Sequence, residues 1–157
     1  MPLHQETRVL SYTAEQMYAV VADVERYPEF LPWCSKLIVQ KRERQNGIEF
    51  ITAEMFIAYP PLRERYISRV RLDPERRTIE ARHVEGPFQR LDTRWRFVPL
   101  AKGSEVHFLI DFAFRSVLLT TVAGGVFGFA ASRMAEAFVH RAEKLYGAER
   151  LSENLQQ

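Results

Sequence analysis

The chain has 157 residues, of which 46% are hydrophobic and 27% charged, and its formal net charge is +2. This length predicts one domain, the composition is typical of a soluble globular protein, and the small net charge gives no argument for a nucleic-acid-binding protein. The single cysteine, Cys34, excludes an internal disulfide, and the N-terminus lacks the pattern of a signal peptide, so we expect a cytoplasmic protein.

A short strand and an amphipathic helix open the chain. Residues 7–10 read as a strand, and Thr13 and Gln16 form a capping box, in which each side chain accepts a hydrogen bond from the other's backbone N–H. The apolar residues that follow at helical spacing are Met17, Val20, Val21 and Val24. We therefore predict a helix that starts after Thr13.

The predicted helix ends in a segment rich in proline and aromatic residues, 23–34 (DVERYPEFLPWC), which we call the elbow. Proline lacks a backbone donor and pushes the preceding residue out of the helical region, so Pro28 and Pro32 break the helix. A segment this apolar must be buried or must cover something apolar. Two interpretations stay open: the elbow is a corner of the core, or it is a lid over an apolar cavity.

Six further strand-like segments follow at regular spacing, separated by turn residues. They cover about 36–44, 48–58, 62–72, 77–84, 90–98 and 104–115. Asn46-Gly47 is a strong hairpin signal between the first two. In the last segment Val106, Phe108, Ile110, Phe112 and Phe114 alternate with residues that are mostly polar, which indicates one buried and one solvated face. We predict an antiparallel sheet of about seven strands.

A long helix is predicted from Ser116 to about Tyr146, with Gly147 as its stop. On a helical wheel its apolar face holds Phe127, Ala131, Met134, Phe138, Ala142 and Leu145. A helix lying against an antiparallel sheet is an α+β arrangement, so we expect one domain over 1–147 and a polar tail over 148–157.

The first half of this helix is uncharged from Ser116 to Ser132 and is flanked by Arg115 and Arg133. These 17 residues are fewer than the about 20 that a spanning helix needs, so we expect no transmembrane segment. The side opposite the core is nevertheless apolar, at Leu118, Val122, Val126 and Phe129. Such a surface must be covered. A partner subunit or the elbow could cover it, but we favour docking on a bilayer.

Several segments together resemble a known family. The elbow, PPLRERY at 60–66, GPF at 86–88, WRF at 95–97, DFAFRS at 111–116 and AFVHRA at 137–142 occur in the order typical of coenzyme Q-binding START-domain proteins, within the polyketide cyclase and lipid-transport superfamily. The resemblance implies a helix-grip fold, in which a curved sheet surrounds the C-terminal helix. A sister family, the bacterial ribosome-association toxins, shares the elbow and the GPF motif.

The resemblance also implies that a prenylated quinone such as ubiquinone binds between sheet and helix, with no catalytic residue, metal or further cofactor. The ligand contacts we expect are Phe30, Trp33, Tyr66, Val70, Trp95, Phe97, Phe108, Ile110, Phe112, Phe127, Met134, Phe138 and Arg141. For most of these the alternative is a packed core, because a sequence cannot show a void. Arg141 either forms a structural salt bridge, to Glu25 or Glu29, or contacts the ligand at the mouth of a cavity.

A second candidate surface is the arginine-rich outer face of the sheet, formed by Arg63, Arg65, Arg69, Arg71, Arg94 and Arg96. It is either a solvated face interleaved with acids or a contact for anionic lipid headgroups or RNA phosphate. The main hypothesis is a non-enzymatic quinone-binding protein that serves respiratory or biosynthetic enzymes, peripherally at the inner membrane. The alternative is a ribosome-association protein that binds ribosomal RNA. A cyclase-like enzyme is disfavoured, because the inward residues hold no acid–base pair.

Overall fold

The computed structural model describes residues 3–60 and 62–156. The elements, in chain order, are β1 (Leu3–Leu10), α1 (Ala14–Ala22), the 3₁₀ helix η1 (Val24–Glu29), β2 (Cys34–Gln45), β3 (Ile48–Tyr59), β4 (Leu62–Asp73), β5 (Thr78–Glu85), β6 (Phe88–Pro99), β7 (Ser104–Phe114), α2 (Val117–Ser132) and α3 (Met134–Gln156). Within these residues seven strands form one antiparallel sheet in the order β1-β7-β6-β5-β4-β3-β2. The predicted α+β fold with a curved sheet is confirmed.

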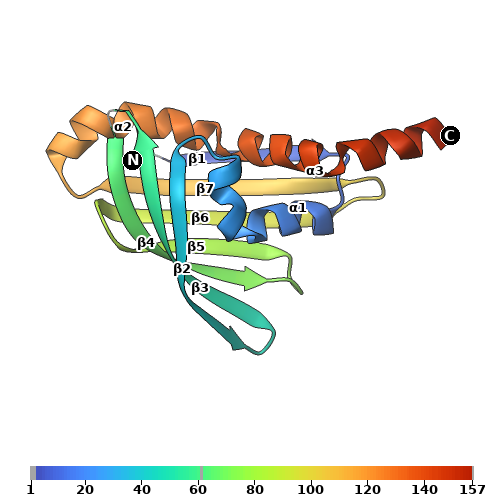
Figure 1. The fold of residues 1–157 in the computed structure, drawn as a ribbon, viewed down its shortest axis with the longest axis horizontal. Coiled ribbons are helices and arrows are strands. Elements are labelled where there is room, and N and C mark those ends of the chain that lie inside the picture. Colours follow the sequence, from blue (N-terminus) through green and yellow to red (C-terminus); the bar gives the residue numbers. More distant parts are fainter. Residues whose placement is uncertain (1–2, 61, 157) are drawn as a thin grey trace.

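The sheet bends so that β2–β4 cross the direction of β6 and β7, while α2 and α3 run along β7 (Figure 1). Part of this bend comes from register shifts, which lie at two places in the β2–β3 pair and at one place each in the β4–β5 and β6–β7 pairs. An extra residue in one strand kinks it and increases its twist. The concave face of the curved sheet is thereby turned toward the helices.

The termini of the strands follow from turn chemistry and pairing. Asn46 and Gly47 both have positive φ, 54° and 81°, as the predicted tight hairpin between β2 and β3 requires. Gly103 has φ 91°, and a Cβ there would lie 1.9 Å from the carbonyl oxygen of Leu10, so only glycine fits. β1 begins at Leu3, four residues before the predicted start, because it pairs with β7 from Asp111 onward.

The predicted single long helix is wrong: two helices meet at Arg133 with an angle of 40°. The hydroxyl of Ser132 donates to the carbonyl oxygen of Phe129 at 2.7 Å. In a continuous helix this carbonyl would accept from the N–H of Arg133. The N–H of Arg133 bonds instead to the carbonyl oxygens of Ala130 and Ala131, and the helix ends there. In the part of the chain that the structure describes, no single helix is long and apolar enough to span a bilayer; α2 and the first part of α3 pass that test only as a bent pair.

α3 continues through Gly147 to Gln156, so the predicted helix stop at Gly147 is also wrong. The predicted core face of α3 is largely correct, since Phe138 and Ala142 are buried. Leu145 is the exception, at 49% exposed. Its neighbour Tyr146 faces the core instead and packs on Tyr12, which lies between β1 and α1; the two ring centroids are 6.5 Å apart.

Candidate functional site

The elbow is packed against α3. Tyr27, Phe30 and Phe138 form a cluster of edge-to-face rings with centroids 5.2 to 5.9 Å apart, and the Tyr27 hydroxyl donates to the carbonyl oxygen of Val21. Trp33 is only 7% exposed. Edge-to-face pairs of this kind add stability beyond the burial of their area. The elbow is therefore part of the core, as one of the two interpretations predicted.

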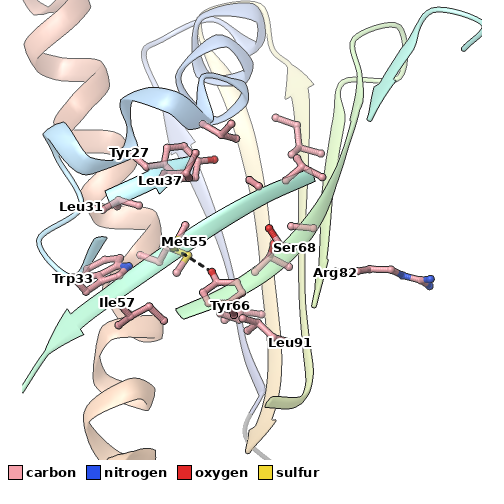
Figure 2. A pocket seen from close by; sticks show the side chains of 18 of the residues that line it. Tyr27, Leu31, Trp33, Leu37, Met55, Ile57, Tyr66, Ser68, Arg82 and Leu91 are labelled. Carbon is pink, nitrogen blue, oxygen red and sulfur yellow. Dashed lines mark hydrogen bonds between the residues drawn. The ribbon is translucent and has the colours of Figure 1, made fainter. Parts of the chain in front are cut away.

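Behind the elbow lies a cavity of about 80 Å³, bounded by β2–β7 and by α2 and α3 (Figure 2). Its walls are mainly apolar. The lining residues are Val24, Tyr27, Leu31, Trp33, Leu37, Ala53, Met55, Ile57, Tyr66, Ser68, Val70, Ile79, Ala81, Arg82, Leu91, Thr93, Trp95, Ile110, Phe127, Met134 and Phe138. The Arg82 side chain points away from the cavity, so its backbone side forms the wall (Figure 2).

The structure brings most of the predicted ligand contacts to this cavity. The predicted residues that line it are Trp33, Tyr66, Val70, Trp95, Ile110, Phe127, Met134 and Phe138. Phe97, Phe108 and Phe112 do not line it, because they are packed into the core between sheet and helices: Phe97 lies edge-on to Tyr18, and Phe112 lies edge-on to Phe127. Ligand contact itself stays a prediction for all of them.

Phe30 and Arg141 also lie outside the cavity, in an open crevice between elbow and α3. Nη2 of Arg141 donates to Oε1 of Glu29 at 3.2 Å, and its guanidinium lies 5.2 Å from the Phe30 ring centroid. Arg141 therefore forms the predicted structural salt bridge, with Glu29 as its partner. It does not line the cavity, and its contact with a ligand at the mouth stays a prediction. Glu25 pairs instead with Arg42 of β2.

Trp33 lies at the boundary between these two spaces. It lines the cavity, the open crevice, and a smaller space next to α2 that Ile57 and Val126 also line. Among the described residues, Trp33 is the only one that lines both the crevice and the cavity, so its indole lies between the two spaces. The position of Trp33 between crevice and cavity agrees with the elbow being a lid over the cavity. It agrees equally with the elbow being a corner of the core.

The sequence-based prediction missed 13 of the 21 residues that line the cavity. The inner side of β3, at Ala53, Met55 and Ile57, could have been found from the alternation of this strand. Ser68 and Thr93 carried no signal, because a small polar residue between apolar ones reads as ordinary strand. Both lie on the inner face of the sheet, in line with Val70 and Trp95 respectively.

The titratable groups near the cavity are held in their neutral forms. Burial raises the pKa of Tyr66, whose hydroxyl donates to Sδ of Met55 at 3.2 Å. Burial raises the pKa of Cys34 to about 11. Burial, and secondarily the charge of Arg115, lowers the pKa of His83. Among the residues the structure describes, no group of His, Cys, Asp and Glu could hold a metal ion.

The outer face of the sheet mixes arginines with acids. Arg65 pairs with Glu54 at 2.5 Å and Arg71 with Asp73 at 3.5 Å, while Arg69 lies over the Phe50 ring. The arginines of this face without an ion pair to any described residue are Arg63, Arg69, Arg82, Arg94 and Arg96. The face therefore has free cations but no continuous basic stripe.

The outer side of α2 is an exposed apolar surface, as predicted. Val117 is 84% exposed, Leu118 72%, Val122 51% and Phe129 52%. The prediction is wrong for Val126, which is half-buried and faces the space next to Trp33. The reason is that Val126 lies at the margin of the helix face that packs on the sheet. The guanidinium of Arg133 lies 5.0 Å from the Phe129 ring centroid at the end of this surface.

Comparison with known proteins places this geometry in context. Residues 10–139 match the protein family described as polyketide cyclase / dehydrase and lipid transport. The chain is 33% identical over 144 residues to the ribosome association toxin RatA of Rickettsia prowazekii, covering 90% of this chain and 96% of that protein. It is 34% identical over 149 residues to the coenzyme Q-binding protein COQ10 homolog B of Xenopus laevis, covering 92% of this chain and 59% of that mitochondrial protein.

Among solved structures, the chain is similar to the 18 kDa protein CC1736 of Caulobacter crescentus. The two share 36% sequence identity and superpose with a TM-score of 0.75, over 94% of this chain and 99% of that one.

Proposed function

The chain belongs to the polyketide cyclase/dehydrase and lipid transport family, and from this premise we propose that it binds a prenylated quinone such as ubiquinone without chemical conversion. The observation that carries the proposal is the mainly apolar cavity behind the elbow. Ligand sites are concave and mainly apolar with a few polar groups, and this cavity has that composition. The name of the Xenopus relative supports coenzyme Q as the ligand class.

The cavity at about 80 Å³ is smaller than the roughly 300–1,000 Å³ typical of sites for drug-sized ligands. It has room for several water molecules, since one needs roughly 10–15 Å³. The expected burial of a whole isoprenoid tail therefore does not fit this closed form. We infer that the ring end of the ligand enters first and that the elbow moves to admit it.

Burial of apolar surface supplies the affinity in this mechanism. Each CH₂ group taken out of water contributes about 0.8 kcal/mol, so a few isoprene units at the cavity and under the elbow hold the ligand. The protein would shield the quinone from water and pass it to respiratory or biosynthetic enzymes. No acid–base pair lines the cavity among the described residues, and the proposal needs none.

The test is lipid extraction and mass spectrometry on the purified protein, beside a variant whose cavity is filled. Ala53→Leu places a larger side chain on the cavity wall, and Ala58→Leu adds the same bulk at an exposed position of the same strand. We expect quinone with the wild type and with Ala58→Leu, and much less with Ala53→Leu. Absence of quinone from wild-type protein made in quinone-containing cells would contradict the proposal.

We further propose that ligand exchange takes place at a bilayer, with the outer side of α2 as the docking surface. Its exposed apolar side chains match the acyl boundary, and Arg115 and Arg133 at its two ends match anionic headgroups. No acidic residue lies between them to oppose this. Phe127 and Met134, on the inner side of the same helical pair, line the cavity, so docking and ligand exchange would share one element.

Ribosome association stays the second candidate function. The observation that favours it is that the chain covers 96% of the Rickettsia toxin, against 59% of the Xenopus relative. Arg82, Arg94 and Arg96 would supply the phosphate contacts. Co-sedimentation with ribosomes, compared between wild type and an Arg94→Glu, Arg96→Glu double variant, tests it. Binding that depends on these arginines, in protein without quinone, would favour this candidate.

A further inference from the structure

Two hydroxyl groups on the sheet wall of the cavity have no hydrogen-bonding partner among the residues that the structure describes. Ser68 of β4 is 8% exposed, and Thr93 of β6 is half-buried; both line the cavity. Neither hydroxyl bonds to any residue that the structure describes. Nε2 of His83 is also buried without a partner; His83 is directly opposite Ser68 in the register of β4 and β5 but does not line the cavity.

Unpaired polar groups are unusual in such a setting. Nε2 of His83 is the one buried side-chain nitrogen or oxygen without a partner among the described residues, so the two hydroxyl oxygens keep some accessible surface. Their hydrogen-bonding capacity is therefore left for a group inside the cavity. The wall around these two hydroxyls is otherwise apolar, formed by Val70, Ala81 and Leu91. Packing alone would favour alanine and valine at these positions. The hydroxyls therefore point to a ligand that has hydrogen-bonding atoms at this wall.

The register of the strands sets the separation of the Cα atoms of Ser68 and Thr93. Thr93 pairs with Ala81 of β5, which is two residues from His83, the partner of Ser68. Two strand steps and a shift of two residues correspond to roughly 12 Å between the two Cα atoms on a flat sheet. On the concave face of this curved sheet the side chains converge. A single six-membered ring with an oxygen on each side fits between two donors so placed.

We propose that Ser68 and Thr93 bind the ring oxygens of the ligand, one hydroxyl to each side of the ring. This inference rests on the proposed function and adds the orientation of the ligand to it. Ser68 lies across the cavity from Trp33 (Figure 2), so the ring lies against β4–β6 while the tail leads out under the elbow. The tail then follows the boundary that Trp33 forms with the outer crevice.

The test compares a ligand with ring oxygens and a ligand without oxygen. Decylubiquinone and the isoprenoid hydrocarbon farnesene serve as probes, with Ser68→Ala and Thr93→Val as variants that remove one hydroxyl each and keep the shape. Thr52→Val, on the outer face of β3, is the matched control. We expect Ser68→Ala and Thr93→Val each to lower the affinity for decylubiquinone by roughly three- to tenfold, which is the effect of one hydrogen bond. Their affinity for farnesene should be unchanged.

A second measurement separates ligand contact from a structural role. Without ligand, both variants should unfold at the same urea concentration as wild type or at a higher one, because neither hydroxyl bonds to a described residue and no hydrogen bond of the folded protein is lost. Wild-type decylubiquinone affinity in both folded variants would overturn the inference while the proposed function stands. Equal weakening of both probes would also overturn it, since that marks a change of cavity shape. Failure of wild type to bind decylubiquinone would instead overturn the proposed function.

Discussion

Arg141 of α3 and Glu29 at the end of η1 are joined by a hydrogen bond of 3.2 Å that ties the elbow to the C-terminal helix. The second carboxylate oxygen of Glu29 accepts from Arg26 at 2.8 Å, and the hydrogen bond from Arg26 is the main cause that lowers the pKa of Glu29. The bond from Arg141 spans the open crevice outside Trp33. Opening the elbow would break this bond, so it should slow ligand exchange.

Arg141→Met removes that bond and keeps most of the apolar stem. We expect release of bound decylubiquinone to vesicles to become several-fold faster, with little change in the urea midpoint of unfolding, because the pair is partly exposed to solvent. Arg26→Met is the control, since it removes a bond to the same Glu29 without untying α3. Equal release rates for all three proteins would show that the pair does not hold the elbow closed.

Trp33→Ala should separate the two roles of the elbow. The loss of a buried indole costs about 3–5 kcal/mol in the free energy of unfolding. If Trp33 is also the partition between crevice and cavity, quinone release should accelerate at least tenfold, and Trp33→Phe should give intermediate values for both. Stability and release are measured by urea unfolding and by transfer to acceptor vesicles. A loss of stability with an unchanged release rate would make the elbow only a corner of the core.

Val122→Glu and Phe129→Glu test the docking surface of α2. Both positions are about half exposed, so the variants should fold, while each buried charge at the acyl boundary should reduce co-sedimentation with anionic vesicles by about tenfold or more. Val9→Glu on β1 is the control, since Val9 is 70% exposed and lies away from α2. Vesicle binding equal to wild type in both α2 variants would exclude this surface.

The stability of the protein should depend on pH through His83. Its pKa is lowered in the folded protein, so between that pKa and the unfolded value of about 6.5 the unfolded chain binds more protons. The free energy of unfolding should therefore rise with pH across this window, by at most about 1.4 kcal/mol per pH unit, and level off above pH 7. Urea unfolding at pH 5.5, 6.5 and 7.5 measures this, with His83→Phe expected to reduce the slope and the exposed His140→Gln not to.

Cys34 should be unreactive while the elbow is closed. Burial raises the pKa of its thiol to about 11, so at pH 8 only about one thiol in a thousand is ionised, against roughly a quarter at the ordinary value of about 8.5. Alkylation by iodoacetamide should be at least about a hundredfold slower in the folded protein than in urea. Fast labelling of Cys34 in the folded protein would mean that the elbow opens often. In that case the release of bound ligand should also be fast.

Local sequence patterns were sufficient for most of the fold. The alternation of Val106, Phe108 and Ile110 predicted the buried face of β7, and Asn46-Gly47 predicted the first hairpin, because each is decided by a few neighbouring residues. The break between α2 and α3 was not predicted. It depends on the Ser132 hydroxyl taking the carbonyl of Phe129, a choice that the apolar periodicity on both sides of Arg133 does not reveal.

For the site, the sequence by itself determined which side chains point inward, since the period of a strand or helix fixes its faces. It also determined the exposed apolar side of α2 and the apolar elbow. Only the tertiary structure decided that Trp95 and Phe138 line a cavity while Phe97 and Phe108 fill the core. A cavity is the volume that inward side chains from distant elements leave unfilled. The curvature of the sheet and the 40° bend at Arg133 set that volume, and both are properties of the whole fold.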